Sequence, residues 1–179
     1  KDFGAATASN GAVGLYHIEN LTPEAVELGK DLILENAKEY IIDDAELERV
    51  YKSYPVMWKD PNKAPQLCFV GCPHLSLEQL KTWTVDVERE LAANNLKKVT
   101  IKTVFTAAPK VLEAFNQTEY AARLKKTGVI TSYICPLMYM NNPLCKKMPV
   151  ITSSNKLRTY TSSRYYTDAE ILHLITTKG

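Results

Sequence analysis

The feature that most constrains this chain is a repeated alternation of short apolar runs with amphipathic stretches. Four of the apolar runs have the length of strands, and they cover 67–70, 99–105, 129–134 and 148–152. The run over 99–105 also alternates with a period of two, which is typical of a half-buried strand. Strand–helix units of about 30 residues need crossover connections, which make neighbouring strands parallel and cover both faces of the sheet. The sequence therefore predicts an α/β fold with a mainly parallel sheet layered by helices.

Capping signals place helices between these runs. Ser76 and Gln79 have the spacing of a capping box, so we expect a helix to start there. A longer helix is expected over 109–126, with an interruption near Asn116. Gly128 suits the left-handed residue just beyond its end, because glycine adopts a positive φ without steric cost.

The amino-terminal third of the chain has its own start signals. Thr22 supplies an N-cap oxygen and Pro23 the tolerated first helical position, which predicts a helix that reaches Ile33. The remaining expected elements are a strand over 12–18, a short strand over 40–42, a helix capped by Asp43 or Asp44 that ends before Pro55, and a final helix over 168–177. The polar, proline-containing loop 59–65 is the expected linker, and a sub-boundary is predicted there.

The composition limits the classes of partner and the compartment. The chain has 179 residues, a net charge of +2, and 23% charged residues. This balance gives no electrostatic argument for nucleic acid or an anionic membrane, so neither is expected as a partner. The apolar runs are far shorter than the roughly 20 residues of a membrane span, and no export signal is visible. Four cysteines are too few for a disulfide scaffold of this length, so a cytoplasmic location is expected.

One tetrapeptide carries the strongest chemical signal. Gly71, Cys72, Pro73 and His74 follow the apolar run 67–70, so a thiol and an imidazole stand at the carboxyl end of a predicted strand. In open α/β sheets, ligands gather at that edge. The glycine permits a sharp turn, and the proline keeps the cysteine out of the helical region. The arrangement suits a sulfur that points into a site.

A second thiol stands at another predicted strand end, where Cys135 and Pro136 follow the run 129–134. Three interpretations stay open. Cys72 and His74 could form a nucleophile–base pair, although no third residue that orients them can be named. Cys72 and Cys135 could instead bind a soft metal or an iron–sulfur cluster, which two cysteines alone cannot complete. Either cysteine could also be a buried structural residue.

Polar groups follow the run 148–152. Ser153, Ser154 and Lys156 combine two hydroxyls with an ammonium. Together with the local backbone N–H groups they could hold a carboxylate or a phosphate. The alternative is a polar turn with a solvated lysine, which the spacing alone favours.

The amino-terminal segment offers similar but weaker candidates. Ser9 and Asn10 stand at the entrance to the strand expected over 12–18, with the same two interpretations. Glu24 is explained most simply as a first-turn residue that favours the positive end of the helix dipole.

Six short runs of the sequence are weak signals individually, but their order along the chain makes a specific match to one family. They are Gly4-Ala5-Ala6 with Ser9-Asn10-Gly11-Ala12-Val13, then His17, Thr22-Pro23-Glu24-Ala25, Gly71-Cys72-Pro73-His74-Leu75-Ser76, Cys135-Pro136, and Thr152-Ser153-Ser154-Asn155-Lys156. With these runs the chain resembles the aconitase X family, which includes cis-3-hydroxyproline dehydratases and phosphomevalonate dehydratases of the archaeal type. The resemblance implies an aconitase-like domain, in which residues 1–179 form the carboxyl-terminal portion of a large subunit.

The resemblance also implies a metal site and a substrate site. Cysteines at the positions of Cys72 and Cys135 look like ligands of an iron–sulfur cluster or a mononuclear iron. The third ligand would come from the missing amino-terminal part of the large subunit. The implied substrate-binding residues are Ser153, Ser154, Lys156, Ser9 and Asn10.

The implied reaction is that of a hydro-lyase. His74 and Glu24 are the expected catalytic residues, and a small swivelling domain or subunit completes the site. Such a dehydratase removes water from a small hydroxylated carboxylate or phosphorylated substrate, with iron as a Lewis acid. The stretch 160–164 lacks the Pro-Gly turn found near a tyrosine in the family, which leaves the substrate open.

A function of a different class is the alternative. The chain could be a degenerate, non-catalytic aconitase-like module for binding or assembly. Under either interpretation the chain by itself is expected to be inactive, because it would hold only part of the site.

Overall fold

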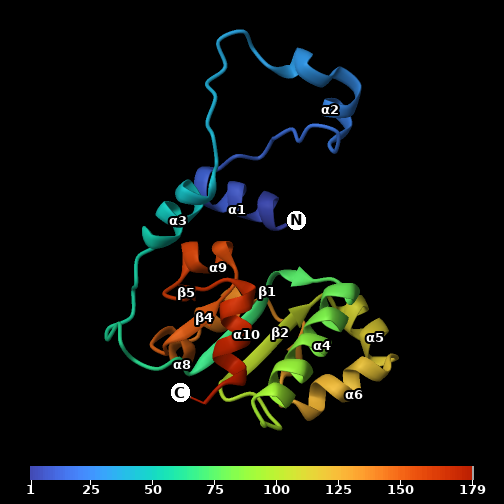
Figure 1. Ribbon diagram of the computed structural model, residues 1–179, viewed down its shortest axis with the longest axis vertical. Helices are drawn as coiled ribbons and strands as arrows, with labels where there is room; N and C mark the ends of the chain where they lie inside the picture. Colours follow the sequence, from blue (N-terminus) through green and yellow to red (C-terminus); the bar gives the residue numbers. More distant parts are fainter. Residues whose placement is uncertain (179) are drawn as a thin grey trace.

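A computed structural model describes residues 1–178 and contains a five-stranded sheet in the order β3-β2-β1-β4-β5. The strands are β1 (Leu67–Leu75), β2 (Lys102–Ala107), β3 (Ile130–Ser132), β4 (Val150–Thr152) and β5 (Arg164–Tyr165). Every neighbouring pair is parallel, and β1 is the central strand (Figure 1). The predicted α/β fold with a parallel sheet layered by helices is confirmed.

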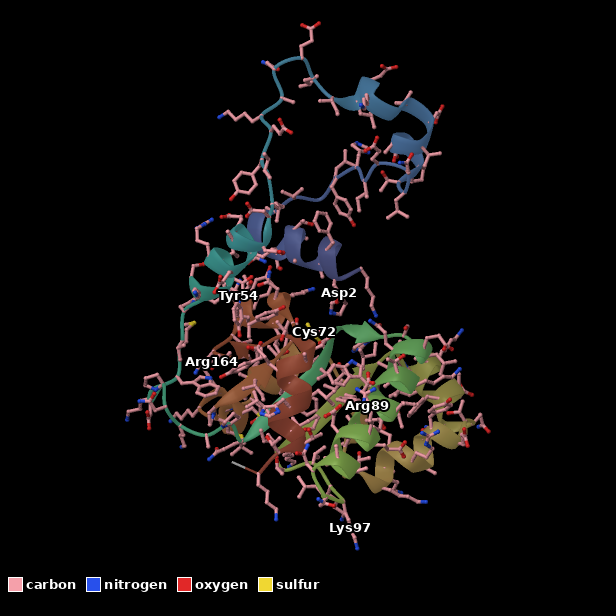
Figure 2. All side chains as sticks on the ribbon, in the orientation of Figure 1. Asp2, Tyr54, Cys72, Arg89, Lys97 and Arg164 are labelled. Atoms are coloured by element: carbon pink, nitrogen blue, oxygen red, sulfur yellow. The ribbon has the colours of Figure 1, made fainter. Side chains whose placement is uncertain are left out.

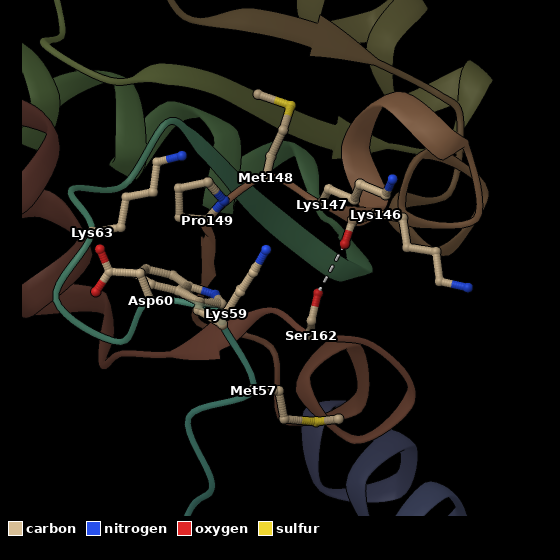
Figure 3. Close-up of a pocket in the computed structure, with 10 residues that line it drawn as sticks. Met57, Lys59, Asp60, Lys63, Lys146, Lys147, Met148, Pro149 and Ser162 are labelled. Carbon is tan, nitrogen blue, oxygen red and sulfur yellow. Dashed lines mark hydrogen bonds between the residues drawn. The ribbon is translucent and has the colours of Figure 1, made fainter.

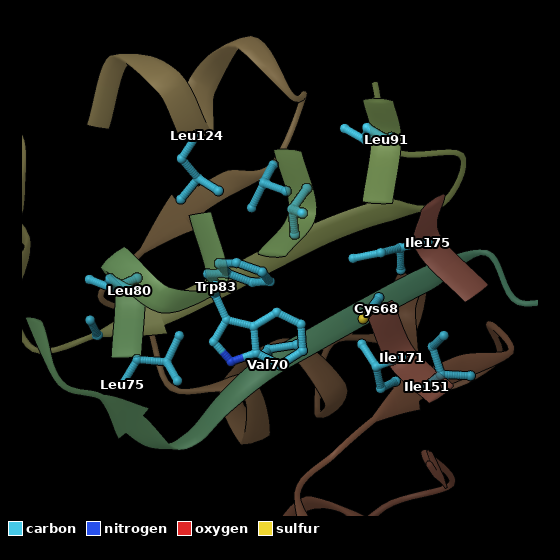
Figure 4. Packing of buried hydrophobic residues seen from close by; sticks show 14 of the residues in the cluster. Cys68, Val70, Leu75, Leu80, Trp83, Leu91, Leu124, Ile151, Ile171 and Ile175 are labelled. Carbon is cyan, nitrogen blue, oxygen red and sulfur yellow. The ribbon is translucent and has the colours of Figure 1, made fainter. Parts of the chain in front are cut away.

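The two faces of the sheet are covered by different helices. One face carries α4 (Leu77–Ala93), α5 (Pro109–Asn116), α6 (Glu119–Lys126) and α10 (Asp168–Thr176). The other carries α7 (Pro136–Met140), α8 (Pro143–Lys146) and α9 (Asn155–Tyr160). Cys68 and Val70 contribute to the first core, whereas Leu67 and Phe69 contribute to the second, as the two-residue period of a strand requires. Figure 4 shows the first core, in which Trp83 packs between the helices and the sheet.

Local capping explains the helix ends that the sequence predicted. Ser76 and Gln79 form the reciprocal capping box before α4, and Thr167 forms another with Glu170 before α10. The predicted helix over 109–126 is two helices, α5 and α6, so the expected interruption is confirmed. Gly128 has a φ of +84°, the left-handed conformation expected just beyond α6.

Strand boundaries differ from those predicted, because neighbouring elements decide them. The run 99–105 joins the sheet only at Lys102. Before that point its backbone bonds to the ends of helices: Val99 N donates to Thr127 O at 2.9 Å, and Thr100 N donates to Ile175 O at 2.8 Å. The strands β3 and β4 are likewise shorter than the apolar runs that predicted them. The sequence did not predict α7, α8, α9 or β5.

The residues before the sheet form helices joined by extended segments. These helices are α1 (Asp2–Gly11), α2 (Pro23–Leu28), the 3-10 helix η1 (Gly29–Leu32) and α3 (Asp44–Lys52). The side chain of Asp43 accepts a hydrogen bond from Glu46 N at 2.8 Å, so the predicted cap of α3 is confirmed. The helix predicted to run from Pro23 to Ile33 is interrupted at Gly29, which has a φ of +55°.

The strands predicted over 12–18 and 40–42 are wrong, because both segments are irregular. They lie in an arm that extends away from the sheet (Figure 1), so their backbones have no strand with which to pair. Leu15 and Ile41 are 73% and 74% exposed there. Ser9 and Asn10 consequently end an unpredicted helix, α1, and do not open a strand.

Two contacts hold the amino-terminal helices to the carboxyl edge of the sheet. Asn10 Oδ1 in α1 accepts hydrogen bonds from Thr159 Oγ1 at 2.7 Å and from Arg158 at 3.2 Å, both in α9. Tyr51 in α3 donates its hydroxyl to the carboxylate of Glu170 at 2.9 Å.

The loop 59–65 runs between α3 and β1 without helix or strand. Within residues 1–178, a helix with the length and apolar character to cross a membrane is absent.

The turn at the end of β1 requires glycine. Gly71 has a φ of +109°, a conformation that residues with a side chain adopt at a cost. A Cβ atom added there would overlap the carbonyl oxygen of Thr106 and approach its Oγ1 to 2.8 Å. Thr106 Oγ1 in turn donates a hydrogen bond to the Gly71 carbonyl at 2.6 Å. The close approach therefore fixes the path of the chain into Cys72.

Replacing this glycine should destabilise the protein. Gly71→Ala introduces both backbone strain and a backbone overlap, so we expect the free energy of unfolding to fall by about 2 to 4 kcal/mol. Gly14→Ala is the matched control, because nothing lies within 4 Å of a Cβ built at Gly14. Chemical denaturation measures both variants. Equal stability of Gly71→Ala and Gly14→Ala would contradict this account of the turn.

Candidate functional site

Cys72 lies at the carboxyl end of β1 and is 8% exposed. The pairing register of β1 with β2 shifts between Val70 and Leu75. Because of this irregularity, Cys72 packs in the core of the α7 face, whereas Cys68 packs in the core of the α4 face. The two cysteines of this strand therefore lie in different cores, and Cys68 is fully buried.

Cys135 reaches the same region from another element. It is the N-cap residue of α7, the helix that follows β3. This helix packs across β1, where the Tyr139 and Phe69 rings stack with centroids 5.3 Å apart, and Met140 shares a buried cluster with Cys72. A negative charge on Cys135 would raise the pKa of the Cys72 thiol, in keeping with the packing of α7 against β1. Cys72 and Cys135 are thus far apart in the sequence but belong to elements that pack together.

The segment after β4 is built around Ser154, which is 6% exposed. Its hydroxyl donates to the backbone carbonyl of Cys72 and accepts from Leu157 N at 2.9 Å, which makes it the N-cap of α9. Thr152 Oγ1 ties the same segment to β1 by donating to Phe69 O at 2.8 Å. These bonds hold the segment rigidly beside Cys72, so it is not the simple solvated turn that was the alternative.

A cavity of about 310 Å³ opens at this edge of the sheet. Cys72, Ser153, Ser154 and Lys156 all line it, so the structure brings four of the predicted site residues together. The wall opposite the strand ends belongs to α1. A neighbouring cavity of about 250 Å³ shares Cys72, Ser153 and Ser154 with the first.

Two residues that line both cavities were missed in the sequence. Asp2 comes from the first turn of α1, and Tyr165 from the edge strand β5. Figure 2 shows Asp2 above Cys72, across the gap between α1 and the sheet. In the sequence, Tyr165 belongs to a group of tyrosines and arginines over 158–166 that hints at an anion site or an interface. No local pattern marks Asp2, because only the packing of α1 brings it here.

Groups around Cys72 shift the pKa of its thiol in opposite directions. Burial raises the pKa of the Cys72 thiol, since the thiolate loses solvation, and the Ser154 hydroxyl near the sulfur lowers this pKa. The Lys156 ammonium also lowers this pKa, whereas the Asp2 carboxylate raises it. The Lys156 ammonium and the Asp2 carboxylate therefore shift the pKa of the Cys72 thiol in opposite directions.

His74 is close to the cavities in sequence but does not line them. Its backbone carbonyl accepts a hydrogen bond from Lys1 Nζ at 2.5 Å. Its Nε2 is buried and has no hydrogen-bond partner among residues 1–178. Burial, together with the Lys1 charge, lowers the pKa of this imidazole, so its neutral form is favoured.

The other predicted site residues lie farther out. The Ser9 hydroxyl donates within α1 to Ala5 O at 2.7 Å, and Asn10 bonds to α9 as described above. Glu24 lies on α2 in the extended arm, 3.8 Å from His17 Nδ1. In Figure 1 this arm is remote from the sheet, so the structure does not bring Glu24 to the cavity.

The donor set for a metal is incomplete within this chain. Among residues 1–178, no group of three His, Cys, Asp or Glu side chains is placed to hold a metal ion. Cys72 supplies one soft sulfur donor to the cavity and Cys135 a second one at the start of α7, which fits part of an iron–sulfur or soft-metal site. A further ligand would have to come from outside the described residues.

Comparison with known families gives two matches along the chain. Residues 1–52 match the family model for the aconitase X second domain, and residues 65–175 match that for the aconitase X third domain. The crystal structure of aconitase X from Thermococcus kodakaraensis in its holo-form superposes with a TM-score of 0.72 at 22% identity. The superposition covers 99% of this chain and 43% of the Thermococcus chain, and at this identity the likeness shows the fold.

Curated relatives are longer than the region they share with this chain. The phosphomevalonate dehydratase large subunit of Methanosarcina mazei is 40% identical over 81 residues, which are 45% of this chain and 18% of that protein. The protein of the same name from Methanothermobacter thermautotrophicus is 30% identical over 111 residues, which are 62% of this chain and 26% of that protein. The matched regions thus cover about a fifth to a quarter of the length of these relatives.

The bonds of Ser154 predict a structural cost for its removal. Ser154→Ala deletes both the N-cap of α9 and the donor to the Cys72 carbonyl, so we expect a loss of about 1 to 3 kcal/mol in the free energy of unfolding. Ser162→Ala is the control, because its hydroxyl makes only a long 3.4 Å bond to Lys146 O. Urea unfolding measures the free energy of unfolding of both variants. An unchanged free energy of unfolding in Ser154→Ala would contradict the rigid attachment of this segment.

The charges around Cys72 predict opposite shifts in thiol reactivity for the metal-free protein. Lys156→Met removes the charge that lowers the pKa of Cys72, so alkylation should require a higher pH. Asp2→Asn removes a charge that raises this pKa, so the alkylation profile should move to lower pH. Peptide mass spectrometry of iodoacetamide-treated protein measures Cys72 alone. Shifts of the same sign in both variants would show that neither charge faces this thiol.

Proposed function

The chain belongs to the aconitase X family, and we propose that it supplies one side of the active site of an iron-dependent dehydratase. The substrate is a small hydroxylated carboxylate or a phosphorylated hydroxy compound. Curated relatives are named phosphomevalonate dehydratase large subunit, which supports a hydro-lyase reaction. The observation that carries the proposal is that Cys72 and Lys156 line one cavity at the carboxyl edge of the sheet, with Cys135 at the start of the helix that packs across β1.

In this proposal Cys72 and Cys135 hold the iron centre, either a cluster or a single iron. Thiolates suit such centres, and the packing of α7, which begins after Cys135, against the strand that carries Cys72 supports a shared ligand role. The iron would supply Lewis acidity toward the leaving hydroxyl or a substrate carboxylate. A third ligand comes from the amino-terminal part of the large subunit, since the described residues contain no three-ligand group.

Lys156 is the proposed anchor for the substrate anion. It lines the same cavity as Cys72 and brings the positive charge there, and Ser153 adds a hydroxyl to the wall. Ser154 positions the site, because its hydroxyl bonds to the backbone of Cys72 and is thereby committed. Ser9 and Asn10 act through α1, whose contact with α9 keeps that wall in place.

Proton transfer is assigned to His74 and Glu24. The neutral form of His74, favoured by burial, is the form that can accept a proton, and its Nε2 has no competing partner among residues 1–178. Glu24 can take part only in an arrangement that brings the arm carrying α2 over the cavity. A swivelling domain or subunit that closes the site would also exclude water from it.

The proposed domain organisation follows the same line. Residues 1–179 form the carboxyl-terminal portion of a large subunit, with a sub-boundary in the loop 59–65. The two family models support this division, since one ends at residue 52 and the other begins at residue 65. The missing amino-terminal part and the small swivelling domain or subunit are the proposed partners. The chain by itself is expected to be inactive, because it lacks the third ligand.

Iron binding by the complete enzyme tests the proposal. The full-length large subunit with its small subunit, reconstituted anaerobically with iron and sulfide, should show iron and visible absorption that Cys72→Ser and Cys135→Ser each abolish. Cys145→Ser is the matched control, because Cys145 is a half-buried cysteine of the same face that the proposal does not use. It should retain full iron content and activity.

The contrary results separate the alternatives. Full iron content in both Cys72→Ser and Cys135→Ser would remove the ligand assignment. Iron-independent activity that iodoacetamide destroys would favour a thiol nucleophile. Absence of dehydration of any hydroxy acid, hydroxyproline or phosphomevalonate by the iron-loaded complex would favour a non-catalytic assembly module.

A further inference from the structure

A third cavity lies at the opposite edge of the sheet from Cys72. Three loops form it, and each loop directly precedes a strand: residues 57–63 lead into β1, residues 146–149 into β4, and Ser162 into β5. Gln66 N donates to Pro149 O at 2.9 Å and joins the first two loops. The cavity has a volume of about 720 Å³, within the range of small-molecule sites. We call it the basic cavity.

Its charge is strongly one-sided. Lys59, Lys63, Lys146 and Lys147 line it, and the single carboxylate among the lining residues is that of Asp60. Figure 3 shows Lys59 and Lys63 on one side, with Lys146 and Lys147 on the other. Within residues 1–178 none of these four lysines forms an ion pair. Four ammonium groups around one hollow repel one another, so an anion there would lower their energy.

The carboxylate is already engaged locally. Asp60 Oδ1 accepts a hydrogen bond from Asn62 N at 3.0 Å, which closes a turn in the loop. Arg164 braces the same loop, because its guanidinium donates to Pro61 O at 3.4 Å and lies 5.8 Å from the centre of the Trp58 ring. These contacts hold the lysine-bearing loop against β5 without neutralising the lysines.

Trp58 gives an independent indication of a ligand. It lines the basic cavity, is 9% exposed, and its buried Nε1 has no hydrogen-bond partner among residues 1–178. A buried donor without an acceptor costs about 1 to 3 kcal/mol, and such groups are rare in native proteins. Because this N–H has almost no exposed surface, an anionic oxygen would accept from it only after a small movement of the loop that carries Trp58.

The lining selects the kind of anion. Lysine ammonium groups bind phosphate oxygens as point charges. The cavity is far larger than one phosphate, and Met57, Met148, Pro149 and Trp58 give it an apolar wall. We propose that the basic cavity binds a small organic phosphate that carries two or more negative charges and an aromatic or apolar group, of the nucleoside diphosphate type.

This site is separate from the one assigned to dehydration. The basic cavity shares no lining residue with the two cavities beside Cys72, and the length of β1 lies between them. The inference therefore does not rest on the proposed function. Loss of iron binding or of dehydration would leave it untouched, and failure of anion binding would leave the dehydratase proposal untouched.

Isothermal titration of the purified protein with ADP tests the proposal. ADP should bind with one-to-one stoichiometry, and the double variant Lys63→Gln with Lys147→Gln should weaken binding at least about tenfold through the loss of two charges. Lys97→Gln is a single-charge control, because Lys97 does not line the cavity and lies apart from Arg164 in Figure 2, and it should leave the affinity unchanged. Trp58→Phe keeps an aromatic ring but removes the N–H donor, and it should weaken binding several-fold.

Other probes separate the sources of affinity. Adenosine, which has no phosphate, should not bind, and pyrophosphate should bind more weakly than ADP because it lacks the apolar group. Circular dichroism and thermal unfolding establish that each variant is folded. Absence of ADP binding to the unmodified protein, or equal binding by the double lysine variant, would overturn the site. Pyrophosphate binding as tight as ADP would overturn the role of the apolar wall, and tighter binding of a polyglutamate peptide would point to an acidic protein segment.

Discussion

The close approach of Gly71 to Thr106 is the contact on which the candidate site depends. Up to Val70, β1 follows a regular parallel register with β2, and alternate side chains enter the two cores. At Gly71 the chain turns with a positive φ, and the Thr106 hydroxyl fastens the turn through the Gly71 carbonyl. Cys72 thereby leaves the face that Cys68 occupies and meets the segment around Ser154. Without this turn, the strand alternation would place Cys72 on the same face as Cys68.

Much of the sheet domain could be predicted, because its signals are local. The capping box of Ser76 with Gln79, the break after Asn116 and the left-handed Gly128 are properties of neighbouring residues, and each was found. The strand predicted over 12–18 failed for the opposite reason. Its composition suits a strand, but a strand also needs a partner, and the arm that carries these residues lies away from the sheet.

The candidate site shows the same division between local and distant information. Cys72 and Cys135 were identified from their own surroundings, as thiols that follow apolar runs and precede prolines. Asp2 could not be identified, since it reaches the cavity only through the packing of α1, and Tyr165 stood out only as one of a group of tyrosines and arginines. The basic cavity could not be predicted either, because its lysines belong to two loops that meet only through the pairing of β1 with β4.

The central claim is that Cys72 and Cys135 bind one iron centre together. Anomalous diffraction at the iron absorption edge, from crystals of the iron-loaded full-length enzyme, tests it most directly. The account predicts iron within about 2.3 Å of both sulfur atoms, the usual length of a soft metal–thiolate bond. An iron peak that neither sulfur contacts, or sulfur atoms too far apart to share one centre, would contradict it.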